Sequence, residues 1–197
     1  MLRFCLALLI ALWVCAPIDG DLHAADKPQE RRGDPIAGKR KTAGCNGCHA
    51  VAGMKNVPNL GGQGTAYFVA AMRAYRDGAR GHATMRDVAA QFSERDLVDL
   101  AAHYADVAPI GEAAAAAPPD VSTPCTQCHG PEGAQSAMPE VPRLAGQKPA
   151  YLEQTLRAYR SGARAHPIMQ QQAAALTDEQ IGELAAYFSG RPGLIVK

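Results

Sequence analysis

Apolar residues recur at helical spacing along most of the chain, and no alternating run of consequence predicts a β-strand. Apolar positions predict helices over 66–77 and 150–161, and each of these segments is followed at once by a glycine that favours a helix end. Ser93 and Thr177 each begin a capping-box pattern, which predicts the start of another helix. The pattern therefore predicts an all-α protein.

The chain contains one internal repeat. A shift of 84 residues places Pro58–Tyr104 on Pro142–Phe188 with 20 identities in 47 positions. Two copies of a module are too few for a solenoid. Residues 110–122 hold a run of alanines and two prolines, which is typical of a linker. We therefore divide the chain into a first domain over 25–109, this Ala/Pro linker, and a second domain over 123–197.

The N-terminal residues are typical of an export signal. A positive charge precedes an apolar run of 13 residues, Phe4–Ala16. This run is too short to span a bilayer, which takes about 20 apolar residues, but suits a signal peptide. Cleavage after Ala24 would remove residues 1–24, and an uncleaved anchor is the alternative. Cys5 and Cys15 would leave with the signal, and the four cysteines that remain all belong to two short motifs, so no other thiol is available for a structural disulfide.

The overall composition is that of a folded soluble protein. The chain is 47% hydrophobic and 20% charged, with 20 Lys and Arg against 19 Asp and Glu. This balance excludes a disordered chain and a basic nucleic-acid-binding domain. Each copy has only about 80 residues, a length at which a hydrophobic core alone is marginally stabilising. We therefore expect another group to fill part of each core.

The other four cysteines form two Cys-x-x-Cys-His motifs, Cys45–His49 and Cys125–His129. In the c-type haem attachment pattern, two thiols on one helical turn bind the haem and the adjacent histidine ligates the iron. A zinc site would place about 15–20 residues between two cysteine pairs, but 76 residues separate Cys48 from Cys125. A thioredoxin-like site would need a βαβ context. The sequence therefore predicts two covalently bound c-type haems.

The second axial ligand of each iron is expected further along each copy. Met85 and Met169 superpose under the repeat and lie 36 and 40 residues beyond the haem histidines. Thioether ligation raises the haem potential and leaves no open position for a substrate. His82 and His166 also superpose, and would give haems of lower potential instead. We favour the methionines, and expect the two histidines in polar loops near the haem edge.

Two further pairs of residues are candidates for contacts with the haem or its ligands. Pro58 and Pro142 follow the haem histidines, and their carbonyls could accept the second ring N–H of each axial histidine, with a simple turn as the alternative. Arg80 and Arg164 are candidates for pairing with haem propionates, with exposure to water as the alternative.

After Cys-x-x-Cys-His, each copy continues through Pro-x-Leu-x-Gly-Gln and Ala-Tyr-Arg-x-Gly-x-Arg to a methionine and a final Leu-Ala-Ala. These paired motifs resemble the c4 class of dihaem cytochromes over about residues 34–190. The resemblance implies two tandem class I cytochrome c domains related by a pseudo-twofold axis, with their haems facing each other. By position, it implies haem attachment at Cys45, Cys48, Cys125 and Cys128, and iron ligation by His49 with Met85 and His129 with Met169.

The resemblance also implies a function. It implies electron transfer in the bacterial periplasm, with peripheral membrane association, between an upstream quinol-oxidising complex and a haem–copper terminal oxidase. Such a carrier has redox proteins as partners, binds no nucleic acid and is not an enzyme. One alternative is a dihaem subunit of a flavin- or quinone-dependent dehydrogenase complex. A dihaem peroxidase is the other, and would need a five-coordinate haem that binds cyanide or carbon monoxide.

The second copy departs from the family pattern at its start. Asp34 and Pro35 predict the N-cap and first residue of a helix that leads toward Cys45. Only Asp120–Pro124 precede Cys125 in the second copy. We therefore expect its N-terminal element to be a bare turn.

Overall fold

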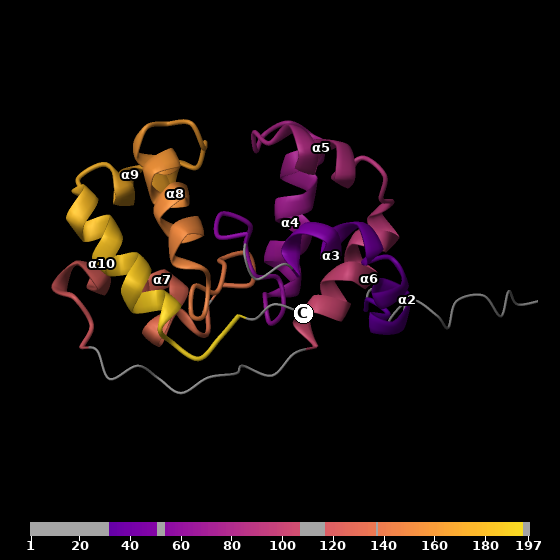
Figure 1. Cartoon of the computed structure of the whole chain (residues 1–197), viewed down its shortest axis with the longest axis horizontal. Helices are drawn as coiled ribbons and strands as arrows, with labels where there is room; N and C mark the ends of the chain where they lie inside the picture. Colours follow the sequence, from indigo (N-terminus) through magenta and orange to yellow (C-terminus); the bar gives the residue numbers. More distant parts are fainter. Residues whose placement is uncertain (1–31, 51–53, 107–116, 137, 195–197) are drawn as a thin grey trace, which may run out of the picture.

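The computed structural model describes residues 32–50, 54–106, 117–136 and 138–194. The predicted signal peptide and residues 110–116 of the predicted linker lie outside these ranges. Within them the regular elements are α- and 3₁₀-helices and no β-strand occurs, as predicted (Figure 1). None of the helices in these ranges has both the length and the apolar character that crossing a membrane requires.

From the motif helix onward, the α-helices of the two copies have the same lengths and the same order. The first copy contains α2 (Pro35–Arg40), α3 (Ala43–His49), α4 (Thr65–Arg76), α5 (Ala83–Ala89) and α6 (Glu94–Ala105). The second contains η2 (Asp120–Ser122), α7 (Thr123–His129), η3 (Pro131–Gly133), α8 (Pro149–Arg160), α9 (Pro167–Ala173) and α10 (Asp178–Ser189). The helices predicted over 66–77 and 150–161 are α4 and α8, shifted by one residue. The short helices α5 and α9 were not predicted from the sequence.

The predicted helix ends are confirmed. Gly78 and Gly162 follow α4 and α8 with φ of 78° and 80°, the left-handed region in which a side chain would be strained. Ser93 begins α6 and Thr177 begins α10, each with both hydrogen bonds of a capping box.

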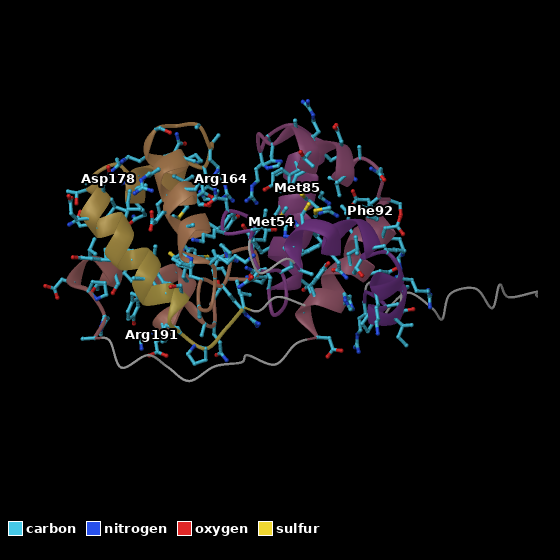
Figure 2. All side chains as sticks on the ribbon, in the orientation of Figure 1. Met54, Met85, Phe92, Arg164, Asp178 and Arg191 are labelled. Carbon is cyan, nitrogen blue, oxygen red and sulfur yellow. The ribbon has the colours of Figure 1, made fainter. Side chains whose placement is uncertain are left out.

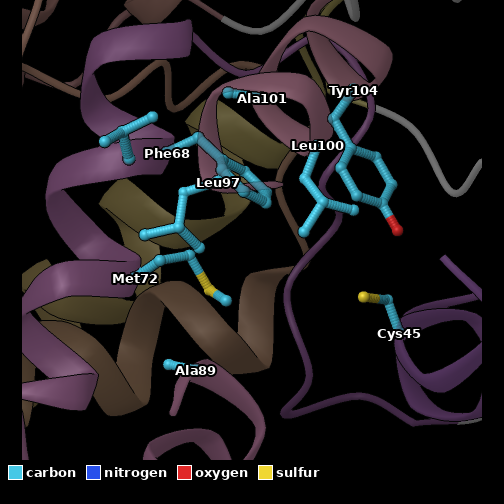
Figure 3. Close-up of a cluster of buried hydrophobic side chains, with 9 residues drawn as sticks. Cys45, Phe68, Met72, Ala89, Leu97, Leu100, Ala101 and Tyr104 are labelled. Carbon is cyan, nitrogen blue, oxygen red and sulfur yellow. The ribbon is translucent and has the colours of Figure 1, made fainter. Parts of the chain in front are cut away.

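Each copy has its own hydrophobic core beneath its last helix. In the first copy, buried residues of α6 pack against Phe68 and Met72 of α4 (Figure 3). Phe68 and Tyr104 stack with ring centroids 5.5 Å apart. The apolar stripe expected on the last helix of each copy is buried: Leu97, Leu100, Ala101 and Tyr104 in α6, and Ile181, Leu184, Ala185 and Phe188 in α10.

The first copy begins with a helix that lies directly against α6. A Cβ atom on Gly38 would sit 2.1 Å from the carbonyl oxygen of Asp99, so only glycine allows this approach. Asp99 is 3% exposed, and its carboxylate accepts hydrogen bonds from Lys41 Nζ and the Asp34 backbone N–H, both at 2.9 Å. Asp34 also caps α2, as predicted. These contacts fix α2 on the outer side of the copy.

The second copy has one 3₁₀ turn, η2, directly before α7, which confirms the expected bare turn. The two Cys-x-x-Cys-His motifs are offset by 80 residues, and at that offset Val121 stands in the place of Lys41. At the 84-residue shift of the later residues, the exposed Glu183 stands in the place of Asp99. The buried charge cluster of the first copy is therefore absent from this end of the second. Figure 1 shows that α4 and α8 lie on the inner sides of the two copies, with α2 and α10 at the outer ends.

Candidate functional site

The motif cysteines lie on α3 and α7, where Cys45 belongs to the first core, Cys125 packs against the second, and Cys48 is exposed. All four thiols are free of disulfides. The sulfur of Cys45 points from α3 toward buried side chains of α4 and α6 (Figure 3). Burial raises the pKa of the Cys45 and Cys125 thiols above the ordinary value. The thiols are therefore available for covalent attachment of an apolar group that would complete each core.

The motif histidines are buried or half-buried, and each is held by one ring nitrogen. His49 Nδ1 lies 2.9 Å from the Pro58 carbonyl oxygen, and His129 Nδ1 lies 2.8 Å from that of Pro142. Burial lowers the pKa of both imidazoles, although the proline carbonyls oppose this effect. A neutral ring that donates from Nδ1 leaves the lone pair of Nε2 free for a metal. This is the tautomer an axial ligand needs.

The favoured methionines lie in the first turns of α5 and α9. Met85 is half-buried and packs against the first core, which contains Cys45 (Figure 2). Met169 is half-buried at the matching position. The 84-residue shift also superposes Met54 on Met138, but these side chains are 41% and 46% exposed. Because Met85 and Met169 are less exposed than Met54 and Met138, they remain the candidates for the second iron ligand of each haem.

His82 and His166, the alternative candidates for iron ligation, cap two short helices. His82 and His166 are exposed and serve as the N-caps of α5 and α9. Their Nδ1 atoms accept the backbone N–H groups of Met85 and Met169, at 3.2 and 3.3 Å. Both histidines are therefore exposed residues outside the helices, as expected of polar loop positions, and in addition they cap the two short helices, which the sequence did not predict.

The two copies are joined by a reciprocal pair of glutamine contacts. Gln147 Oε1 accepts the Asn59 backbone N–H at 2.8 Å, while its Nε2 donates to the Asn59 carbonyl at 3.1 Å. Gln63 makes the same two bonds to the backbone of Arg143, at 2.9 and 3.2 Å. The repeat places Gln63 on Gln147 and Asn59 on Arg143. The contact therefore has the pseudo-twofold symmetry that the resemblance implied.

Arginines and tyrosines form a second symmetric contact between the copies. Each arginine stacks on a tyrosine of its own copy and donates to a tyrosine hydroxyl of the other. Arg80 lies 4.4 Å from the Tyr75 ring centroid and 2.7 Å from Tyr151 Oη. Arg164 lies 4.6 Å from the Tyr159 ring centroid and 3.4 Å from Tyr67 Oη. Figure 2 shows Arg164 on the side of the second copy that faces the first.

This arginine pair leaves positive charge between the copies. Within the described ranges neither Arg80 nor Arg164 forms an ion pair with a carboxylate. Burial acts to raise the pKa of Tyr67, but the two guanidinium charges outweigh burial and lower it. A part-buried cation normally has a counter-charge. The cluster therefore suits anionic groups such as haem propionates.

The residues present fit covalently bound haem and do not fit zinc. Each copy offers two thiols, a neutral imidazole with a free Nε2 and a half-buried thioether, and each contributes one arginine to the cluster between the copies. In contrast, no three His, Cys, Asp or Glu side chains of the described residues gather into a group that could hold a metal ion by themselves. Iron held within a haem needs only the axial ligands from the protein.

Comparisons with known proteins agree with this chemistry. The family model described as Cytochrome c matches residues 120–190. A cytochrome c4 of Pseudomonas aeruginosa is 32% identical over 203 residues, which cover 93% of this chain and 98% of the relative. A thiosulfate dehydrogenase electron acceptor of Thiomonas intermedia is 30% identical over 77% of this chain and 80% of its own length.

A solved structure of a cytochrome c4 is also similar to this chain in fold. The crystal structure of reduced recombinant cytochrome c4 from Pseudomonas stutzeri superposes with a TM-score of 0.69 at 28% identity, covering 81% of this chain and 99% of that one. Two Cys-x-x-Cys-His motifs in two similar helical modules account for a pair of covalent c-type haems. The chain therefore belongs to the cytochrome c4 family of dihaem electron-transfer proteins.

Proposed function

We propose that this protein carries single electrons in the periplasm from an upstream quinol-oxidising complex to a haem–copper terminal oxidase. The observation that supports this most is the histidine geometry, repeated in both copies, together with a half-buried methionine on α5 or α9. When both axial positions are filled by the protein, no position is left for a substrate. This arrangement favours electron transfer over peroxidase chemistry.

Each residue of the site has a proposed role. Haem supplies a reversible one-electron change at its iron. The carbonyls of Pro58 and Pro142 keep the proton on Nδ1 of each histidine and fix the ring orientation, so little rearrangement accompanies the change of charge. We assign thioether attachment to Cys45, Cys48, Cys125 and Cys128, and axial ligation to His49 with Met85 and His129 with Met169.

The arginines between the copies are proposed to bind the haem propionates. Arg80 and Arg164 each contact both copies and have no carboxylate partner among the described residues. These two guanidinium groups would hold the propionates between the copies, and each haem would supply a one-electron change at its iron.

Export and domain limits are also proposals. We propose that residues 1–24 are removed on export, and that domains over 25–109 and 123–197 are joined by the linker over 110–122. Intact mass of the protein recovered from the periplasm tests the cleavage site, because loss of residues 1–24 gives one defined mass. Retention of the full N-terminus would support a membrane anchor instead.

The ligand assignment has a direct spectroscopic test. Methionine-ligated ferric haem has a weak near-infrared band at about 700 nm. Met85→His and Met169→His should each remove about half of this band and lower the potential of one haem, because imidazole replaces thioether. An unchanged spectrum in either variant would contradict the assignment in that copy.

The relationship to the thiosulfate dehydrogenase electron acceptor favours a second candidate, an electron-accepting subunit of a dehydrogenase complex. The two functions differ in their electron donor. Membranes supplied with quinol should reduce the oxidised protein rapidly if it serves the oxidase pathway. Reduction only after addition of thiosulfate to a periplasmic extract, with co-purification of the dehydrogenase, would support the second candidate.

A further inference from the structure

The helices that carry Met85 and Met169 are short and are capped in an unusual way. Helices α5 and α9 have seven residues each, and so short a helix is weakly held by its own propensity. The N-cap residue of each is a histidine, although Ser, Thr, Asp and Asn are the strongly preferred caps. His82 and His166 have nearly the same extended backbone, with ψ of 104° and 105°. Both copies therefore have the same histidine N-cap before the helix that carries the methionine.

Each cap acts on the backbone of the methionine itself. The N–H that His82 Nδ1 accepts belongs to Met85, and the N–H that His166 Nδ1 accepts belongs to Met169. A bond at this atom fixes the methionine Cα, and with it the starting point of the thioether side chain. The first turns of α5 and α9 contain no acidic residue that could stabilise the helix start instead.

Each histidine ring also contacts a tyrosine ring of its own copy. The His82 ring lies edge-on to Tyr75 with centroids 6.1 Å apart, and the His166 ring lies edge-on to Tyr159 at 6.2 Å. Tyr75 is in turn covered by Arg80, which reaches across to the second copy. Each ring is thus held between a tyrosine and the methionine backbone.

We propose that His82 and His166 are positioning residues that hold Met85 and Met169 in place for iron ligation. This rests on the proposed ligation by these methionines. The histidines act through Nδ1 as a hydrogen-bond acceptor, with the ring proton on Nε2, and do not ligate the iron themselves.

The two caps differ in their support. Gln170 Oε1 accepts the His166 backbone N–H at 3.2 Å, and Pro167 begins α9 with a preset φ. The first copy has Arg86 where the second has Gln170. Loss of the histidine side chain should therefore loosen Met85 more than Met169.

Three replacements of His82 in the dihaem protein separate capping from packing. His82→Ala removes the acceptor and the ring, while His82→Phe keeps a ring beside Tyr75 but has no acceptor. His82→Asn places an amide oxygen where Nδ1 stands and should restore the cap. Gln171→Ala, an exposed change on α9, is the control for surface substitution.

Two measurements report on the bond between methionine and iron. One is the methyl resonance of iron-bound methionine in the reduced protein, which gives a separate signal for each haem. The other is the rate at which cyanide binds the oxidised protein, because cyanide needs the methionine to leave. We expect the Ala and Phe variants to raise this rate at the first haem on the order of five-fold, the factor typical of a lost N-cap. The Asn variant should keep the wild-type rate, and His166→Ala should change the second haem less.

The outcomes distinguish this proposal from the ligand assignment. If the wild type shows no bound-methionine signal, the ligand assignment fails. It also fails if Met85→Ala leaves the signals of both haems intact. If the signals are normal and His82→Ala and His82→Phe both match the wild type, the positioning role is refuted. If His82→Asn is as disturbed as His82→Ala, the acceptor at Nδ1 is not what holds the methionine, and the proposal is equally refuted.

Discussion

The contact between the two copies should depend strongly on one buried glutamine. Gln147 is 4% exposed and makes both of its cross-copy hydrogen bonds to the backbone of Asn59, which is 9% exposed. Replacing it as Gln147→Leu keeps a side chain of similar size but removes both bonding partners. The N–H and the carbonyl of Asn59 would then be buried without a partner.

The size of the effect follows from those two groups. A buried polar backbone group that loses its partner costs about 1–3 kcal/mol, so two of them predict a loss of about 2–6 kcal/mol. Gln147 also accepts the backbone N–H of Lys148, which is only part-buried and can turn to water. The Asn59 side chain still donates to the Gly146 carbonyl at 2.9 Å, so the copies should remain in contact.

Guanidinium unfolding of the dihaem protein, followed by far-ultraviolet circular dichroism and haem absorbance, measures this loss. Gln63→Leu should cost less, because the backbone groups of Arg143 that lose their partners are only part-buried and can turn to water. Gln154→Leu, at an exposed position of α8, is the matched control and should change the free energy of unfolding by less than about 0.5 kcal/mol. If Gln147→Leu costs no more than this control, Asn59 has other partners and the reasoning is wrong.

Two further predictions concern the outer end of the first copy. Gly38→Ala should destabilise the protein by about 1–3 kcal/mol, because the new methyl group would meet the Asp99 carbonyl, whereas Gly182→Ala has open space on α10 and should be neutral or stabilising in the same thermal melt. Hydrogen bonds, first of all from Lys41, hold the pKa of Asp96 down to about 2. Burial acts to raise the pKa of Asp99, but the bonds from Lys41 and the Asp34 backbone outweigh burial and lower it. The two carboxylates therefore contribute fully to the free energy of unfolding above about pH 4, and this contribution is lost as the pH falls toward 2. The stability difference between wild type and Lys41→Met should shrink over that range, and a difference independent of pH would contradict this.

Features that depend on neighbouring residues were predictable from the sequence. The Cys-x-x-Cys-His motifs, the capping boxes at Ser93 and Thr177 and the glycine after each long helix involve residues within a few positions of one another. Each such signal has a local physical cause, so no knowledge of the tertiary structure is needed to recognise it. The repeat then gave two independent instances of every motif.

The contacts that join the copies could not be predicted in the same way. Gln147 and Asn59 lie 88 positions apart, and nothing in either local sequence indicates that they meet. The repeat showed that Gln63 and Gln147 match, but not that each contacts the other copy. The caps at His82 and His166 were missed for another reason, because histidine is not among the preferred N-cap residues.

The two copies use matching glutamines and arginines where they face each other, and they differ at their outer ends. An interface with twofold symmetry uses equivalent residues from both sides, which fits the identity of Gln63 with Gln147 and of Arg80 with Arg164. At the outer ends no such matching is required, and there α2 with its buried Asp99 contrasts with the single turn η2. An electron carrier has to meet a donor and an acceptor as well as pass electrons internally. The contact between the haem-bearing halves is therefore symmetric, whereas the two outer ends of the molecule present unlike surfaces.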